Sequence, residues 1–282
     1  MLPVAIVITG ASRGFGRALA LVAANAFSST DDGSNIPSST HPVKLILVAR
    51  SLEGLLETES LIREQEGPGS SAEVSCQAMD LGDLDRLDDH IDKICREIEV
   101  KNSPIRRIIL IQNAGTIGHL GRCRDSPSLK DMQSNVDLNI TSTLWMSARM
   151  SRYAKASSTP LTIVNVSSLV AVDNFPTFGI YSAGKSARDK YHTILSKEEA
   201  STEDEDAAIR ALNYAPGPLE TDMVEEIRAN MARIDASLQP SYKQRALDPM
   251  DSARKLVQLL LKNDFESGAH VDFYDLPDPG SS

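Results

Sequence analysis

Short apolar runs alternate along the chain with longer stretches in which apolar residues recur at helical spacing. Most runs are aliphatic on both faces, as is typical of strands buried in a parallel sheet. The helical spacing is clearest over residues 52–66, 84–99 and 181–199. This alternation predicts a Rossmann-type, doubly wound α/β fold with a mostly parallel, seven-stranded sheet and helices on both faces. The runs are VAIVIT (4–9), VKLILVA (43–49), AEVSCQA (72–78), RRIILIQ (106–112), LTIVNV (161–166), AIRALNY (208–214) and, more weakly, GAHVDFY (268–274).

Polar segments interrupt this pattern without dividing it, so we expect residues 1–282 to form a single domain. Residues 28–42 are rich in Ser, Asp and Pro, and we interpret them as a mobile loop inserted between the first helix and the second strand. The acidic run at 201–206 reads as a solvated turn. Residues 276–282 are expected to form a frayed, disordered tail.

Composition and charge exclude several classes of partner. The net charge is −10, so we expect no nucleic acid to bind. No apolar run approaches the roughly 20 residues of a membrane span, and the first run leads into a glycine motif without a basic region before it, as a core strand rather than a signal sequence does. Three cysteines, none in a C-x-x-C pair, argue against a disulfide framework or a zinc site. We therefore expect a cytoplasmic protein with no metal.

A glycine-rich turn, TGASRGFG over residues 9–16, follows the first expected strand and opens a helix. The three glycines permit a tight turn, a close approach to a pyrophosphate and close helix–strand packing. N–H groups at the start of the helix would then bind the phosphates of a dinucleotide. An ordinary tight turn is the alternative, but its position after the first strand favours the dinucleotide. The expected contacts are Gly10, Ser12, Arg13, Gly14, Phe15 and Gly16.

The end of the second strand predicts which dinucleotide binds. That strand ends Ala49-Arg50-Ser51 and carries no acid to bind a ribose 2′-hydroxyl. Arg50, together with Arg13, would suit a 2′-phosphate, so we expect NADPH/NADP rather than NAD. Alternatively, Arg50 is only a surface residue at a strand end. Further cofactor contacts are expected at Asp80 and Leu81 beside the adenine, and at Asn113, Ala114 and Gly115 along the inner side.

Three residues after the fifth expected strand form a candidate catalytic set. Ser168 precedes Tyr181 by 13 positions, and Lys185 follows Tyr181 by four, which places both on one helical face. With these residues the chain resembles the short-chain dehydrogenase/reductase family. The resemblance covers nearly the whole chain and rests on five motifs in order: T-G-x-x-x-G-x-G, N-A-G, the serine, Y-x-x-x-K and a P-G after the sixth strand.

The family resemblance implies a carbonyl reductase in which the nicotinamide supplies the hydride. Lys185 would lower the pKa of Tyr181, the proton donor, from the usual value near ~10. Lys185 and Tyr181 would also contact the cofactor. Ser168 would bind the substrate oxygen, with Ser167 as the competing hydroxyl. Asn139 matches the family's proton-relay asparagine, or else it only braces its helix.

Within the family, four stretches resemble the members that reduce the side-chain carbonyl of a pterin in tetrahydrobiopterin biosynthesis: GASRGFGRALA, YSAGKSARDK, LNYAPGPLETDM and SGAHVDFYD. This resemblance places Gly217 and Asp272 against the substrate, with Ser168 and Tyr181. The Asp272 carboxylate would accept two adjacent pterin N–H groups, or else it is a solvated charge near the C-terminus. The loop expected to wrap the cofactor includes Leu219, Thr221, Asp222, Met223 and Val224.

Two other functions remain open at this point. The same serine, tyrosine and lysine would serve a reductase of unrelated small carbonyls, such as diketones or quinones. A non-catalytic NADP-binding sensor is the third, although such family members commonly lose the tyrosine or the lysine. Residues 229–247, the expected substrate lid, match no pattern. By resemblance we also expect a homodimer, formed through residues 131–153 and 181–199.

Overall fold

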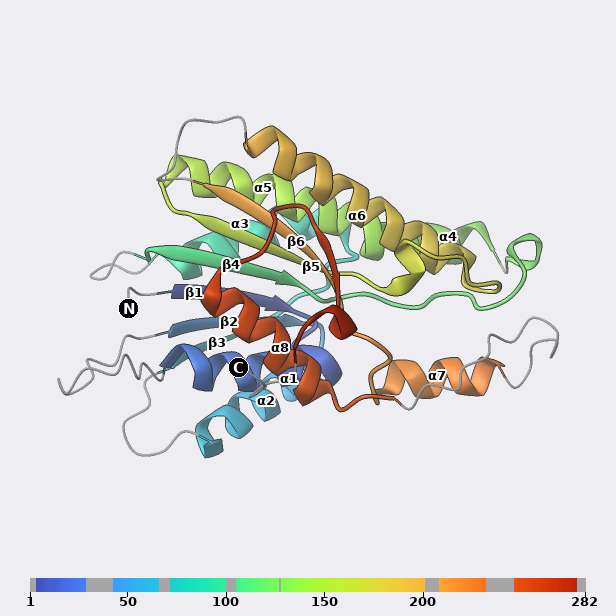
Figure 1. Cartoon of the computed structure of the whole chain (residues 1–282), viewed down its shortest axis with the longest axis horizontal. Helices are drawn as coiled ribbons and strands as arrows, with labels where there is room; N and C mark the ends of the chain where they lie inside the picture. The colour runs from blue at the N-terminus through green and yellow to red at the C-terminus, as the bar shows by residue number, and fades with distance from the viewer. Residues whose placement is uncertain are drawn as a thin grey trace.

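The seven strands form one parallel sheet in the order β3-β2-β1-β4-β5-β6-β7 (Figure 1). The computed structural model describes residues 4–28, 43–65, 72–99, 105–126, 128–200, 208–231 and 246–277. The predicted Rossmann-type sheet is confirmed, and every strand pair in these ranges is parallel. The strands are β1 (Val4–Thr9), β2 (Val43–Ala49), β3 (Glu73–Ala78), β4 (Arg107–Gln112), β5 (Leu161–Val166), β6 (Ile209–Ala215) and β7 (His270–Asp272).

Helices cover both faces of the sheet. One hydrophobic cluster joins α1, α2 and α8 to one face, and a second joins α3, α5 and α6 to the other. Figure 1 shows these two helical layers above and below the strands. The helices are α1 (Gly14–Ser28), α2 (Leu52–Gln65), α3 (Leu87–Ile98), α4 (Leu129–Val136), α5 (Ser142–Ala156), α6 (Gly179–Glu199), α7 (Asp222–Met231) and α8 (Pro249–Lys262).

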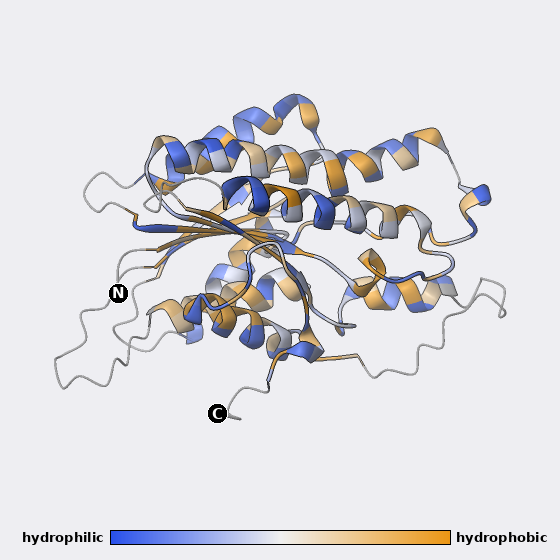
Figure 2. Cartoon of the chain, turned by 45° about the horizontal axis from the view of Figure 1, so that its top comes forward, coloured by the Kyte–Doolittle hydropathy of each residue, from blue (hydrophilic) through white to orange (hydrophobic). Residues whose placement is uncertain are grey.

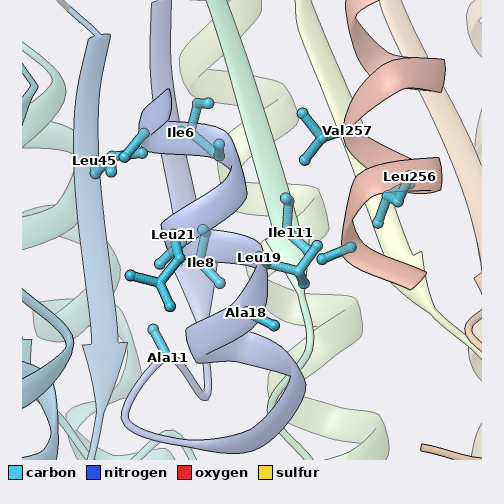
Figure 3. Close-up of a cluster of buried hydrophobic side chains, with 14 of the residues drawn as sticks. Ile6, Ile8, Ala11, Ala18, Leu19, Leu21, Leu45, Ile111, Leu256 and Val257 are labelled. Carbon is cyan, nitrogen blue, oxygen red and sulfur yellow. The ribbon is translucent and has the colours of Figure 1, made fainter. Parts of the chain in front are cut away.

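Alternate residues of the central strands serve the two clusters. Ile6 and Ile8 of β1 pack toward α1 and α8, whereas Ala5 and Val7 pack on the opposite face. Figure 3 shows Ile6 and Ile8 in one cluster with Leu19 of α1 and with Leu256 and Val257 of α8. The strands are mainly hydrophobic in Figure 2, while the helices carry hydrophobic and hydrophilic residues in turn. Burial of both sheet faces explains why the strands read as continuous apolar runs.

The C-terminal run at 268–274 differs from the expectation. Only His270–Asp272 extends as a strand, and Phe273–Asp275 forms a 3₁₀ turn. The Asp272 carboxylate ends the strand, because it accepts the N–H of Tyr274 at 3.0 Å. The expected helix at 84–99 likewise begins as a 3₁₀ turn, Leu84–Arg86.

Several predictions fall on segments outside the described residues. These are 29–42 of the predicted inserted loop, the acidic run at 201–206, most of the expected lid at 229–247, and the tail from 278 onward. Within the described ranges, no helix is both long and apolar enough to cross a membrane.

Candidate active site

A cleft of about 1320 Å³ opens where the carboxyl ends of the central strands meet the glycine-rich turn. Open α/β sheets bind their ligands at this edge. The structure brings nearly all the predicted site residues together here; Gly16 and Asn139 lie outside the lining. The predicted residues that line the cleft are Gly10, Ser12, Arg13, Gly14, Phe15, Arg50, Ser51, Asp80, Leu81, Asn113, Ala114, Gly115, Ser168, Tyr181, Lys185, Gly217, Leu219, Thr221, Asp222, Met223, Val224 and Asp272.

The glycine-rich turn has a backbone that side chains would obstruct. Gly10 and Gly14 have φ values of +70° and +54°, in the left-handed region. A Cβ on Gly16 would lie 2.1 Å from the carbonyl oxygen of Gly10, so this glycine allows α1 to begin directly against the turn. Asn113 donates to the carbonyl oxygens of Thr9 (3.0 Å) and Gly10 (3.3 Å). The turn and the end of β4 therefore form one wall of the cleft.

Arginines surround the cofactor end of the cleft. Arg50 follows β2, and Arg13 pairs with Asp222 at the start of α7. Both members of that ion pair were predicted as cofactor contacts, and both are largely exposed, at 73% and 65%. Arg17 also lines the cleft and pairs with Glu57 at 2.7 Å. No carboxylate follows β2 directly, although Glu53 and Glu57 of α2 also line the cleft.

Tyr181 and Lys185 lie one turn apart near the start of α6. The Lys185 Nζ atom lies 5.5 Å from the centre of the Tyr181 ring and donates to the carbonyl of Val166 at 2.6 Å. Burial is the main cause that lowers the pKa of Lys185 well below its ordinary value, with the Arg188 cation second and Asp189 opposing. A phenolate at Tyr181 would offset this cost by giving the buried ammonium a counter-ion.

The two adjacent serines have different partners. Ser167 is buried, and its hydroxyl donates to Asp189 Oδ1 at 2.6 Å. Ser168 caps the 3₁₀ turn Leu169–Ala171, where its oxygen accepts the N–H of Val170 at 3.4 Å. Since the Ser167 proton is committed to a carboxylate, the geometry favours Ser168 as the hydroxyl that donates into the cleft.

Asn139 lies in a π-helical segment, Asp137–Thr141, between α4 and α5. Its buried amide donates to the Thr116 carbonyl at 2.8 Å and accepts the Thr116 N–H at 2.9 Å. Its second donor contact is to Asn135 Oδ1 at 3.0 Å. These contacts brace the loop after β4, the alternative role considered above, and the relay role remains a prediction.

Asp272 lines the cleft, and contacts from Asp275 and from α8 hold the 3₁₀ turn that follows it. Its N–H donates to Asp275 Oδ2 at 2.9 Å, completing a reciprocal cap with the carboxylate contact to Tyr274. Lys255 of α8 donates to the Leu276 carbonyl at 2.8 Å and lies 4.0 Å from the centre of the Phe273 ring. The carboxylate is thus presented from a fixed turn rather than from a free tail.

Sequence reasoning missed much of the apolar wall of the cleft. Several of these residues lie on loops and short 3₁₀ turns, where no periodic pattern marks them, whereas Val166 ends β5 and Ile227 lies on α7. Pro216 belongs to the P-G motif, and Tyr274 adjoins Asp272. The missed lining residues include Met79, Leu138, Val166, Leu169, Val170, Phe175, Phe178, Pro216, Pro218, Ile227, Tyr274 and Asp275.

The comparison with protein families defines the class of protein. A family model described as short chain dehydrogenase matches residues 38–232. The chain belongs to the short-chain dehydrogenase/reductase family, and it is an oxidoreductase that acts on CH–OH or carbonyl groups. The family binds NAD(P)(H), consistent with the glycine turn and the arginines at the cofactor end.

Individual relatives are more specific. The chain is 35% identical to the sepiapterin reductase of Rattus norvegicus over 282 residues, covering 96% of each chain. It is 24% identical to a benzil reductase ((S)-benzoin forming) of Bacillus subtilis, covering 79% of this chain and 78% of that one. Among solved structures, the KRED1-Pglu enzyme has a TM-score of 0.71 at 23% identity, over 95% of this chain and 99% of that one, which shows the shared fold.

Proposed function

We propose that this protein is an NADPH-dependent sepiapterin reductase, which reduces the side-chain carbonyl of a pterin in tetrahydrobiopterin biosynthesis. The observation that carries the proposal is the Tyr181–Lys185 pair in a cleft that Asp272 also lines. Similarity to sepiapterin reductases over most of the chain supports the same assignment.

The chemistry follows from the positions of these side chains. A bound nicotinamide supplies the hydride that reduces the carbonyl carbon. Ser168 donates a hydrogen bond to the carbonyl oxygen and holds it near Tyr181. The Tyr181 hydroxyl gives its proton to that oxygen as negative charge develops, which leaves an alcohol and a phenolate. Lys185 stabilises the phenolate until solvent returns the proton, and Asn139 is the proposed relay toward the lysine.

NADPH fits the cofactor end better than NADH. Arg50 at the end of β2 and Arg13 in the glycine turn both line the cleft, and each offers a planar set of donors for a 2′-phosphate. The remaining predicted contacts, from Asp80–Leu81, Asn113–Gly115 and the 219–224 loop, would hold the adenine and the inner side of the cofactor. Phosphate would displace Asp222 from Arg13 at little cost, because an exposed ion pair contributes little free energy.

Recognition of a pterin would depend mainly on Asp272. Asp272 lines the cleft at the end of β7, and a pterin presents two adjacent N–H groups that one carboxylate can accept together. Gly217, with φ +77°, would let the ring lie close to the backbone of the loop after β6.

A specific observation favours one second candidate, a reductase of apolar diketones. The benzil reductase relative carries that activity in its name, and Phe175, Phe178 and Leu169 provide an apolar wall to the cleft. A non-catalytic NADP sensor is weaker, because the chain retains both Tyr181 and Lys185.

The proposed setting is the cytoplasm, and the proposed assembly is a homodimer. The helices expected at the interface leave large apolar side chains exposed: Trp145 of α5 at 40% and Ile194 of α6 at 48%. We also propose that residues 1–282 act as one domain.

The test is steady-state oxidation of NADPH with sepiapterin and with benzil, for the wild type and Asp272→Ala. We expect the wild type to reduce sepiapterin and the variant to lose that activity while it still reduces benzil. A wild type that ignores sepiapterin but turns over benzil would make the diketone reductase the correct assignment.

A further inference from the structure

One buried carboxylate connects the three elements that carry the proposed substrate groups. Asp189 lies on α6, one helical turn after Lys185 and two after Tyr181, so the three share a face. The whole residue is only 8% exposed. A carboxylate at this depth needs partners to offset its desolvation, and among the described residues the Asp189 side chain has three.

The partners of Asp189 come from different strands. Its Oδ1 atom accepts from Asn165 Nδ2 at 2.8 Å and from Ser167 Oγ at 2.6 Å, both at the end of β5. Its Oδ2 atom accepts from His270 Nδ1 of β7 at 2.6 Å. Ser167 adjoins Ser168, and His270 precedes Asp272 by two positions, so each contact reaches the chain beside a proposed substrate group.

β7 is short, and other contacts hold the chain on either side of it: Thr193 of α6 donates to the Gly268 carbonyl at 3.1 Å before it, and Lys255 of α8 to the Leu276 carbonyl at 2.8 Å after it. β7 is an edge strand of three residues that, among the strands the structure describes, pairs only with β6, with Asp272 opposite Ala215. Residues two apart on a strand point to the same face, so the His270 and Asp272 side chains share one face. The His270 Nε2 atom is buried and has no hydrogen-bond partner among the described residues, so within them Asp189 supplies the hydrogen bond to the ring.

We propose that the Asp189–His270 ion pair is a positioning pair, which holds β7 against α6 and so fixes Asp272 at a set distance from Ser168, Tyr181 and Lys185. The pair would favour substrates that contact Asp272 and the Ser168, Tyr181 and Lys185 side chains at the same time. This inference rests on the proposed role of Asp272 in binding a pterin.

The charges around His270 favour a protonated ring. The hydrogen bond to Asp189 is the main cause that raises the pKa of His270, and burial opposes it. Asp272 and Asp275, on the same segment, raise it further. An ionised pair is stronger and shorter than a neutral hydrogen bond, which suits it to a positioning role.

The test is a set of variants assayed with two substrates. His270→Ala should raise the KM for sepiapterin roughly ten- to a hundredfold, the range expected when a charge-assisted hydrogen bond is lost, with kcat little changed. The kinetics with benzil and the affinity for NADPH should remain those of the wild type. His270→Asn, whose amide donor lies close to the position of Nδ1, should recover part of the sepiapterin KM.

The matched control is Glu73→Gln, which removes the ion pair between Lys44 and Glu73 (2.7 Å) that joins the other edge strand, β3, to β2. Neither residue lines the cleft. This control should leave both substrates unaffected. Equal losses with sepiapterin and benzil in His270→Ala, or no recovery in His270→Asn, would overturn the positioning role.

Asp272→Ala in the same assay separates the two proposals. If Asp272→Ala raises the sepiapterin KM and His270→Ala does not, the positioning pair is wrong and the proposed function stands. If Asp272→Ala leaves sepiapterin kinetics unchanged, the pterin site itself is wrong, and the positioning role fails with it.

Discussion

The ammonium of Lys185 lies 5.5 Å from the centre of the Tyr181 ring and is anchored on the carbonyl oxygen of Val166. The anchor fixes the cation at the end of β5, beside Ser167 and Ser168. A cation held in this way favours the phenolate form of Tyr181 whenever the tyrosine gives up its proton.

The first prediction concerns the tyrosine. Tyr181→Phe removes the proton donor but keeps the ring, so kcat should fall roughly 10²- to 10⁴-fold while the Kd for NADPH stays within a factor of about two. Single-turnover reduction and NADPH fluorescence titration measure the two quantities. A variant with wild-type turnover would rule out Tyr181 as the acid.

The second prediction concerns cofactor choice. Arg50→Ala and Arg13→Ala should each raise the KM for NADPH by roughly tenfold and leave the KM for NADH nearly unchanged, because only NADPH carries the 2′-phosphate. Asp222→Asn frees Arg13 from its exposed partner, so it should keep or slightly improve NADPH binding. Equal effects on the two cofactors would show that these arginines do not contact the phosphate.

The third prediction tests the glycine turn. Gly16→Ala would place a Cβ 2.1 Å from a backbone oxygen that cannot move aside, so it should lower the free energy of unfolding by about 1–3 kcal/mol and weaken NADPH binding. The control is Gly184→Ala in α6, where the added carbon would lie 3.6 Å from Asn139 Cβ, an ordinary contact. Since alanine favours helix over glycine by about 1 kcal/mol, the control should not destabilise the protein. Urea unfolding compares them.

The fourth prediction concerns stability in acid. His192 is buried, its Nδ1 donates to the Arg188 carbonyl at 2.8 Å, and Ser147 Oγ lies 2.9 Å from its Nε2. Burial lowers the pKa of His192 from 6.5 to about 4. As the pH falls, His192 of the unfolded chain therefore takes up a proton before His192 of the folded protein does. Between about pH 6.5 and pH 4, the free energy of unfolding should fall by up to about 1.4 kcal/mol per pH unit.

His192→Gln cannot take up that proton, so its unfolding free energy should fall less steeply than that of the wild type between neutral pH and about pH 5. Chemical unfolding at the two pH values gives both slopes. Parallel slopes in the two proteins would mean that other groups carry the acid sensitivity.

The local motifs were readable from sequence because each is short and its geometry follows from one element. Gly10 to Gly16 form one turn, and Tyr181 and Lys185 lie one helical turn apart. The periodicity of the apolar runs also predicted the parallel sheet, although it overextended the last strand. Asp272 ends that strand by capping the turn after it. The spacing of apolar residues does not predict such a side-chain contact.

The partners beneath the site could not be predicted in this way. Asp189 follows Lys185 closely in sequence, but its contact with His270 spans 81 positions. Arg188 is fully buried and donates to Asn165 Oδ1 and to the Gln112 carbonyl, both at 2.6 Å. A single sequence shows only that these charged residues belong to a helix. Which residue pairs with each of them depends on how the strands align in the folded sheet.

The short strand β7 also has a consequence for the order in which the molecule is made. It is the last strand of the sheet in chain order, and it joins through β6 alone. During synthesis the chain emerges at about 5–20 residues per second, N-terminal part first. All the predicted cofactor contacts, from Gly10 to Val224, precede Asp272 in the chain, so the part of the cleft that would hold the dinucleotide can assemble before Asp272 leaves the ribosome. On this view, a nascent chain becomes able to hold the dinucleotide before it can select a substrate.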